Sequence, residues 1–138
     1  WDWFSLQLAD GTELMLYQMR NRDGTIDPAS SGSFVGESGR VETLRATDYT
    51  IRPRGSWKSP KSGGVYPMGW HVTVPRRGLD LTIDAEMEDQ ELVTTSSTGV
   101  AYWEGAVRAR GTSRGARASG VGYVEMTGYA APFKLRGQ

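Results

Sequence analysis

Glu104 and Glu125 are the residues whose type and spacing best suit chemistry in this sequence. Each carboxylate lies in the middle of an apolar, aromatic stretch near the C-terminal end. If the two stretches are neighbouring strands, the carboxylates project to one face, and we expect that face to be the barrel interior. Enclosure by aromatic side chains would raise their pKa values, which suits a general acid that protonates an alkene or activates water. The alternative is that one or both point to solvent or anchor a barrel end by hydrogen bonds.

His71 is the only histidine and the only side chain whose ordinary pKa lies near neutrality, so it is a candidate base or orienting group. The alternative is a strand histidine that hydrogen-bonds to a neighbour or to water. A single histidine with no cysteine excludes a multi-histidine metal centre and a cysteine-based zinc site. The chain also contains no glycine-rich phosphate loop and no serine elbow. We therefore expect no metal or cofactor.

Aromatic side chains are frequent enough to line a cavity for an apolar ligand. The candidates for ligand binding are Trp3, Tyr17, Trp57, Trp70, Trp103 and Tyr123. The alternative is that most of them simply fill the core. Four arginines, at positions 108, 110, 114 and 117, resemble an anion patch, but interruption by glycine and serine favours a solvated hairpin tip. Sixteen basic residues balance sixteen acidic ones, so no nucleic-acid partner is expected.

Short alternating strands must position these side chains. Residues 3–8 alternate with Phe4, Leu6 and Leu8 on one face, Asp10-Gly11 predicts a tight turn, and residues 13–20 alternate again. The cleanest alternation is at 79–84, with its leucines and isoleucine buried and its polar residues in water. Other expected strands cover residues 33–36, 41–44, 49–52, 70–74, 101–110 and 121–129, with a connection at 111–120 and an edge or bend after Pro53. Residues 85–92 are the one place for a helical turn, 94–99 read as a loop, and 130–138 show no period.

Length and composition predict one all-β domain over residues 1–138, most simply an antiparallel barrel. The apolar fraction of 38% suffices for a core, and no apolar run approaches the roughly 20 residues that span a bilayer. We therefore expect no integral membrane segment. The first residue, Trp1, lies inside an expected strand, so we expect the chain to be a piece of a longer protein.

Several sequence blocks resemble the second half of the carotenoid 1,2-hydratase (hydroxyneurosporene synthase) family and the AttH-like proteins, a group of predicted secreted hydrolases. The longest are DWFSLQL at 2–8 with DG at 10–11 and ELMLY at 13–17, and GYVEMTGY at 122–129. Shorter matches are WKS at 57–59, YP at 66–67, Trp70, VP at 74–75, QE at 90–91 and YWEG at 102–105. The resemblance therefore runs from residue 2 to residue 129.

The resemblance implies a lipocalin-like barrel, normally the second of two in tandem, with its ligand in or between the barrels. The partner would then be the N-terminal barrel of the parent chain, which is absent here, or a second copy that forms a homodimer through the uncovered surface. The family label is compatible with a secreted, periplasmic or membrane-associated protein, but the sequence leaves the compartment open.

Two functional hypotheses from different classes follow, with a third beside them. In the first, the barrel binds an apolar, isoprenoid- or lipid-like molecule through the six aromatic residues named above. In the second, it is the catalytic half of a hydratase or hydrolase, with Glu104 or Glu125 as acid and His71 as base or orienter; protonation of an alkene would form a cation that water captures. In the third, it is a structural scaffold that packs on the missing partner.

Overall fold

The computed structural model describes residues 1–94 and 99–130, and almost all of this part of the chain is antiparallel sheet and turns. The strands, in chain order, are β1 (Asp2–Leu8), β2 (Glu13–Gln18), β3 (Ser31–Val35), β4 (Val41–Arg45), β5 (Thr50–Arg54), β6 (Trp57–Lys58), β7 (Val65–Tyr66), β8 (Gly69–Val74), β9 (Leu79–Ala85), β10 (Glu91–Val93), β11 (Ala101–Ser113) and β12 (Ala116–Thr127), with the 3-10 turn η1 (Pro75–Arg77) between β8 and β9.

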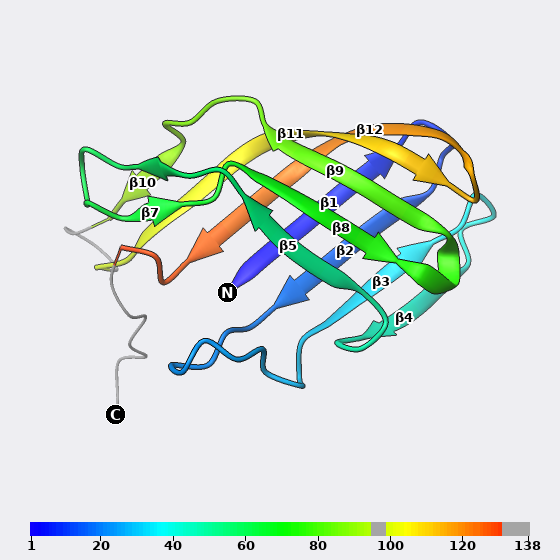
Figure 1. Cartoon of the computed structure of the whole chain (residues 1–138), viewed down its shortest axis with the longest axis horizontal. Coiled ribbons are helices and arrows are strands. Elements are labelled where there is room, and N and C mark those ends of the chain that lie inside the picture. The colour runs from blue at the N-terminus through cyan, green and yellow to red at the C-terminus, as the bar shows by residue number, and fades with distance from the viewer. Residues whose placement is uncertain (95–98, 131–138) are drawn as a thin grey trace.

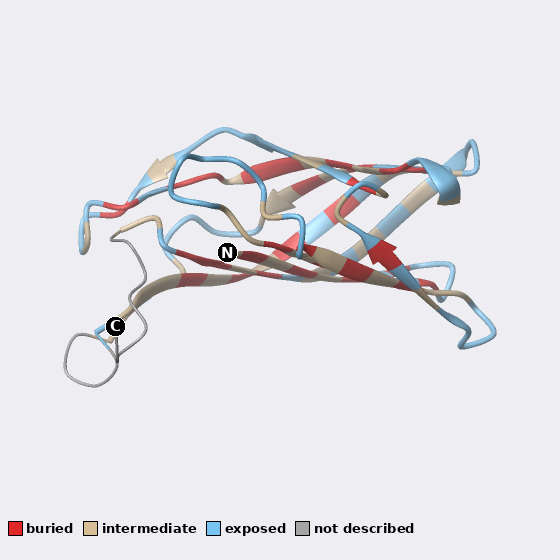
Figure 2. Cartoon of the chain, turned by 90° about the horizontal axis from the view of Figure 1, so that it is seen from below, coloured by how far each residue is buried: buried red, intermediate tan, exposed pale blue. Residues whose placement is uncertain are grey.

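One long sheet with the order β4-β3-β2-β1-β12-β11-β9-β8-β5 forms the body of the molecule, while β10 pairs with β11 and β6 pairs with β7. The sheet curls so that β5, β8 and β9 cross over β1 and β2 (Figure 1). Viewed from its edge, it forms two facing layers with the buried residues between them (Figure 2). The domain is thus a curled antiparallel barrel, as the strand pattern predicts, and it has the lipocalin-like form that the family resemblance implies.

The hairpin of β1 and β2 confirms the first sequence prediction. Phe4, Leu6 and Leu8 are buried on the inner face, and Gly11 takes a left-handed φ of 81° in the turn. β9 also buries the predicted face, Leu79, Leu81 and Ile83. Alternation with period two gives these results directly, because one face of each strand meets the core and the other meets water.

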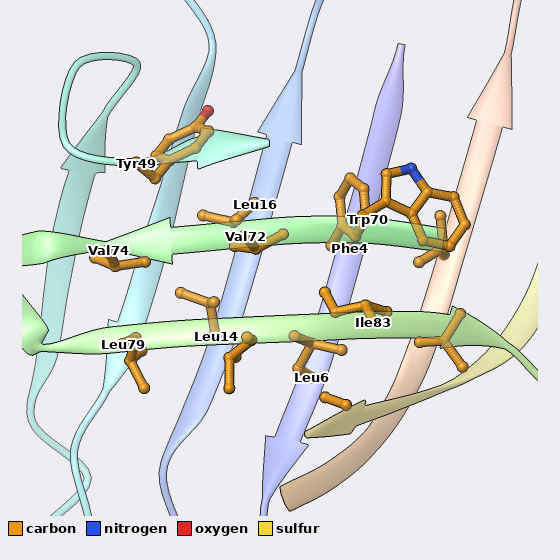
Figure 3. Packing of buried hydrophobic residues seen from close by; sticks show 14 of the residues in the cluster. Phe4, Leu6, Leu14, Leu16, Tyr49, Trp70, Val72, Val74, Leu79 and Ile83 are labelled. Carbon is orange, nitrogen blue, oxygen red and sulfur yellow. The ribbon is translucent and has the colours of Figure 1, made fainter. Parts of the chain in front are cut away.

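Among the described residues, twenty buried apolar side chains fill the space between the two layers. Leu6, Leu14, Leu16, Val72, Leu81 and Ile83 are essentially inaccessible to solvent. Trp70 packs edge-on against Phe4, with ring centroids 5.5 Å apart, and β8 and β9 lay their side chains onto those of β1 and β2 (Figure 3). Each such side chain contributes about 1.5–3 kcal/mol to folding when it is fully buried.

The connection predicted at 111–120 is wrong, because β11 extends to Ser113 and β12 begins at Ala116, which leaves a two-residue turn. The core-facing positions at the start of β12 are small, and an added Cβ at Gly122 would lie 2.1 Å from the Ser5 carbonyl oxygen. These small residues let β12 lie close to β1. Because they are not large apolar residues, this part of β12 lacks the alternation by which a strand is predicted from sequence.

The helical turn considered at 85–92 is also absent, because that segment ends in strand β10 and the one helical turn of the described residues is η1. Pro53 does lie in an edge strand, β5, as expected. Most of the loop expected at 94–99, and residues 131–138, lie outside the described part of the chain. No helix in the described ranges is long and apolar enough to cross a membrane.

Candidate functional site

Glu104 on β11 and Glu125 on β12 lie directly opposite each other across the two paired strands, as their shared alternation predicts. Burial raises the pKa of Glu104, and the charge of Glu125 and a hydrogen bond to it raise that pKa further. The indole nitrogen of Trp1 donates to Glu125 Oε1 at 3.0 Å. The two carboxylates are therefore brought together, and Glu104 holds its proton more readily than an isolated glutamate does.

The expectation that this pair lies inside the barrel is wrong. Their chain neighbours Trp103, Val124 and Met126 are the residues that face the core, so the two glutamates lie on the outer surface of the sheet. Alternation fixes which residues share a face, whereas the direction in which the sheet curls decides which face becomes the interior.

An apolar surface surrounds the glutamate pair, and we call it the outer aromatic face. In register, Tyr17 lies beside Trp3, Trp3 beside Glu125, and Glu125 beside Glu104, in one row across four strands. The next row contains Met15 and Tyr123, and Tyr123 is 44% exposed. The outer aromatic face consists of Trp1, Trp3, Met15, Tyr17, Tyr102, Val121 and Tyr123.

The six predicted ligand-binding aromatics do not line one cavity. Trp3, Tyr17 and Tyr123 belong to the outer aromatic face, whereas Trp70 and Trp103 are buried in the core with ring centroids 6.5 Å apart. Trp57 lies on the β6–β7 hairpin, with its ring centroid 6.3 Å from that of Tyr66. Side-chain type alone cannot separate outer, core and hairpin positions, which accounts for the difference.

His71 lies on β8, away from the two glutamates. Its Nε2 is 2.8 Å from Asp80 Oδ1, and its cross-strand partners are Arg52 and Thr82. Thr82 in turn pairs with Arg110, six residues along β11 from Glu104, which corresponds to about 20 Å of strand. His71 is therefore not brought into hydrogen-bonding reach of either carboxylate.

A buried carboxylate that is not among the predicted catalytic residues lies at the start of β1. Asp2 is 3% exposed, and Arg20 forms an ion pair with its Oδ2 atom, to which the Tyr129 hydroxyl also donates at 3.2 Å. The Arg20 guanidinium lies 4.3 Å from the centre of the Tyr129 ring. Burial raises the pKa of Asp2, although Arg20 and the hydrogen bond from Tyr129 oppose this rise.

Three buried polar atoms near this site lack a hydrogen-bond partner among the described residues. They are Asp2 Oδ1, an acceptor, Trp70 Nε1, a donor, and the Thr127 hydroxyl oxygen, which can be either. Trp70 packs on Phe4, two residues after Asp2, and its indole nitrogen points toward the end at which β1 begins (Figure 3). An unpartnered buried polar group is costly, so such atoms indicate a place where a ligand or water can bind.

A second buried carboxylate, Glu91, accepts hydrogen bonds from three hydroxyl groups. The Ser59 and Ser62 hydroxyls donate to its two oxygens, and the Tyr66 hydroxyl donates at 2.8 Å. These contacts fasten the β6–β7 hairpin to β10. The sequence blocks WKS, YP and QE thus contribute residues to one hydrogen-bond network around Glu91, which we call the hairpin tether. The separate blocks do not reveal this network in the sequence.

Gln90 links the segment before β10 to β11. Its Oε1 accepts from the Ala106 amide at 3.2 Å, and its Nε2 donates to the Met87 carbonyl at 2.9 Å. A Cβ at Gly105 would lie 2.2 Å from Gln90 Nε2, so only glycine leaves room for this side chain. Among the described residues, no cluster of three or more histidines and acids could hold a metal ion.

Comparison with known proteins agrees with this fold. A provisionally assigned AttH protein of Nitrosomonas europaea superposes with a TM-score of 0.81 at 34% identity, and kievitone hydratase of Nectria haematococca with 0.76 at 21% identity. The matches cover 94% and 95% of this chain but only 38% and 39% of those proteins, so the chain spans less than two fifths of either. No curated protein sequence matches it. The AttH-like family model matches residues 1–129, and the chain belongs to the AttH-like family.

Proposed function

We propose that this chain is the ligand-binding barrel of a larger protein and binds an apolar, isoprenoid- or lipid-like molecule at the end of its interior where β1 begins. The observation that carries the proposal is two of the three unpartnered buried atoms, Asp2 Oδ1 and Trp70 Nε1. A ligand hydroxyl can donate to the first and accept from the second, while its apolar part contacts the aromatic rings around it.

Retinol is a suitable probe because it is an isoprenoid with one terminal hydroxyl and its fluorescence rises in an apolar site. We expect saturable binding at micromolar concentration. The Trp70→Phe variant keeps an aromatic ring but loses the donor, and should weaken binding about two- to tenfold. Trp3→Phe, on the outer aromatic face and directed away from the interior, is the matched control and should leave binding unchanged.

Retinyl methyl ether provides a second test, since it cannot donate a hydrogen bond to Asp2 Oδ1 and should bind more weakly than retinol. Absence of saturable binding of retinol would overturn the proposal. Equal affinities of retinol and its ether would also contradict it, because Asp2 would then not contact the ligand.

A second proposal is that the domain is the catalytic half of a hydratase or hydrolase. It is supported by the opposed glutamates on the outer face and by the raised pKa of Glu104. Glu104 would donate the proton to the alkene, water would add to the resulting cation, and the proton that this water then loses would return to the Glu104 carboxylate. Glu125, which hydrogen-bonds to Glu104, would hold the proton until the substrate arrives. A partner surface must cover the pair to exclude water, since both side chains are only partly buried here.

The test of this second proposal is the gain of one water by an isoprenoid alkene, followed by mass spectrometry. Glu104→Gln and Glu125→Gln should each reduce product formation, whereas Glu13→Gln, an exposed position on β2, should not. Unchanged product formation in both glutamine variants would remove the pair from the mechanism.

The third proposal concerns the partner of the outer aromatic face. Its exposed aromatic and aliphatic side chains suit a surface that packs against another domain of a larger protein or against a second copy of this chain. In that case the barrel would act as a scaffold as well.

A further inference from the structure

A cavity of about 670 Å³ is lined by residues of the turns at the end of the barrel opposite Asp2. These turns lie at the right-hand end of Figure 1. The cavity is formed where the β1–β2, β3–β4 and β11–β12 turns meet η1. The side chains and turns that line it include Phe34, Asp10, Glu37, Arg77, Arg114 and Arg117. We call it the arginine cavity. Its volume lies within the range typical of sites for small molecules.

Arg77 is held in a fixed position at this cavity. Its guanidinium lies 4.8 Å from the centre of the Phe34 ring and forms an ion pair with Glu42 through Nη2. Its Nε atom is buried and has no hydrogen-bond partner among the described residues. A donor that is already desolvated and immobilised binds an incoming acceptor at little further entropic cost.

Arg114 occupies an unusual backbone position in the tight β11–β12 turn. Its φ of 49° is the one left-handed value of a non-glycine residue in the described chain, and Gly115 follows with φ 80°. Asparagine, aspartate or glycine is preferred at the first of these two positions. The Arg114 amide donates to the Gly78 carbonyl at 2.9 Å, which fixes the turn against η1. The turn therefore carries a long cation where its backbone favours a small residue.

The formal charges at the cavity balance, so the case for an anion rests on the arginine donors. Opposite Arg77, Arg114 and Arg117 are Glu42, which pairs with Arg77, and two lining carboxylates, Asp10 and Glu37. Asp10 Oδ1 already accepts from the Thr12 amide at 3.0 Å and hydroxyl at 2.6 Å. These hydrogen bonds, more than the nearby Arg114, lower the pKa of Asp10. Arginine is the side chain best suited to hold a planar or tetrahedral oxyanion through two donors at once.

We propose that the arginine cavity binds a small organic anion. Its carboxylate or phosphate group contacts Arg77, Arg114 and Arg117, and its apolar part lies beside Phe34. This site is separate from the one at Asp2, and the proposal does not depend on the ligand of the barrel interior.

Calorimetric titration at low salt with phenyl phosphate and with benzoate tests the proposal and distinguishes the two head groups. At least one of the probes should bind saturably, with an affinity that falls as salt is added. The double variant Arg114→Gln/Arg117→Gln should bind it at least about tenfold more weakly, as expected for two lost charge-assisted hydrogen bonds. Both arginines are exposed, so the fold should persist, which circular dichroism can verify.

Arg108→Gln/Arg110→Gln is the matched control, because it removes the same charge from β11 outside the cavity. It should leave the affinity unchanged. An equal loss in both double variants would overturn the proposal, since the effect would then be one of net charge. Absence of saturable binding of either probe would overturn it too, as would equal affinity for inorganic phosphate and phenyl phosphate, because Phe34 would then contribute nothing.

Discussion

The aromatic rings of Tyr66 and Tyr129 lie 5.3 Å apart, and their hydroxyl groups donate to two different buried carboxylates, Glu91 and Asp2. Burial raises the pKa of both tyrosines, and the neighbouring carboxylates raise it further. Both hydroxyls are therefore protonated at neutral pH and can act as donors there. The contact between the two tyrosine rings connects the hydrogen bonds around Glu91 to those around Asp2 at the start of β1. Two buried carboxylates therefore hold together the structure at this end of the barrel.

Replacement of Glu91 by leucine should destabilise the domain by about 3 kcal/mol, because the hydroxyls of Ser59, Ser62 and Tyr66 lose their shared acceptor. Urea denaturation followed by tryptophan fluorescence measures the free energy of unfolding. Glu88→Leu, at an exposed position three residues earlier, is the control. A loss below about 0.5 kcal/mol in the Glu91 variant would show that these hydrogen bonds do not hold the hairpin in place.

Arg20→Gln should cost about 2–4 kcal/mol at pH 7, because it leaves the Asp2 carboxylate buried without its cation. The pKa of Asp2 is higher in the folded protein than in the unfolded chain, where it is near 3.8. Asp2 therefore stabilises the fold fully at a pH below the unfolded pKa, and this stabilisation is lost as the pH rises through the folded pKa. Without Arg20 the folded pKa rises further, so the cost should shrink as the pH falls toward 4. Urea denaturation of the wild type and the variant between pH 4 and pH 7 measures this loss of stability, with Arg22→Gln as the control. A loss that does not change with pH would contradict the role given to the Asp2 carboxylate.

Glu104→Gln should stabilise the domain by about 0.5 kcal/mol at pH 7, since it removes a like-charge pair across β11 and β12. The folded pKa of Glu104 is raised, so this residue makes the wild-type protein less stable as the pH rises above about 4.5, and the variant should lack that part of the pH dependence. Thermal unfolding at pH 4 and pH 7 measures the difference. If the variant is equally stabilised at both values, repulsion between the carboxylates is not the cause.

Self-association through the outer aromatic face should weaken when its most exposed side chains become polar. Val121 and Tyr123 are 56% and 44% exposed, so Val121→Ser/Tyr123→Ser should shift a dimer toward monomer in sedimentation velocity experiments. Val41→Ser, at a 63% exposed position on β4, should have no effect. A chain that stays monomeric at high concentration would exclude the homodimer.

Local pattern determined much of this protein. Alternation with period two defined the β1–β2 hairpin and the buried face of β9, because each strand must bury one face. It also predicted that Glu104 and Glu125 share a face if their strands are neighbours, and the register of β11 and β12 meets that condition. The motif blocks correctly indicated the AttH-like family.

Only the tertiary structure decided on which side these residues lie. The curl of the sheet turns Glu104, Glu125, Trp3 and Tyr123 outward, and it buries Trp70 and Trp103 in the core. It also brings Asp2 to Arg20 and Tyr129, and Glu91 to Ser59 and Tyr66, over separations of 18 to 127 residues. Strand pattern carries no information about such distant contacts, because they arise from the direction of curvature and from the turns that close each end of the barrel.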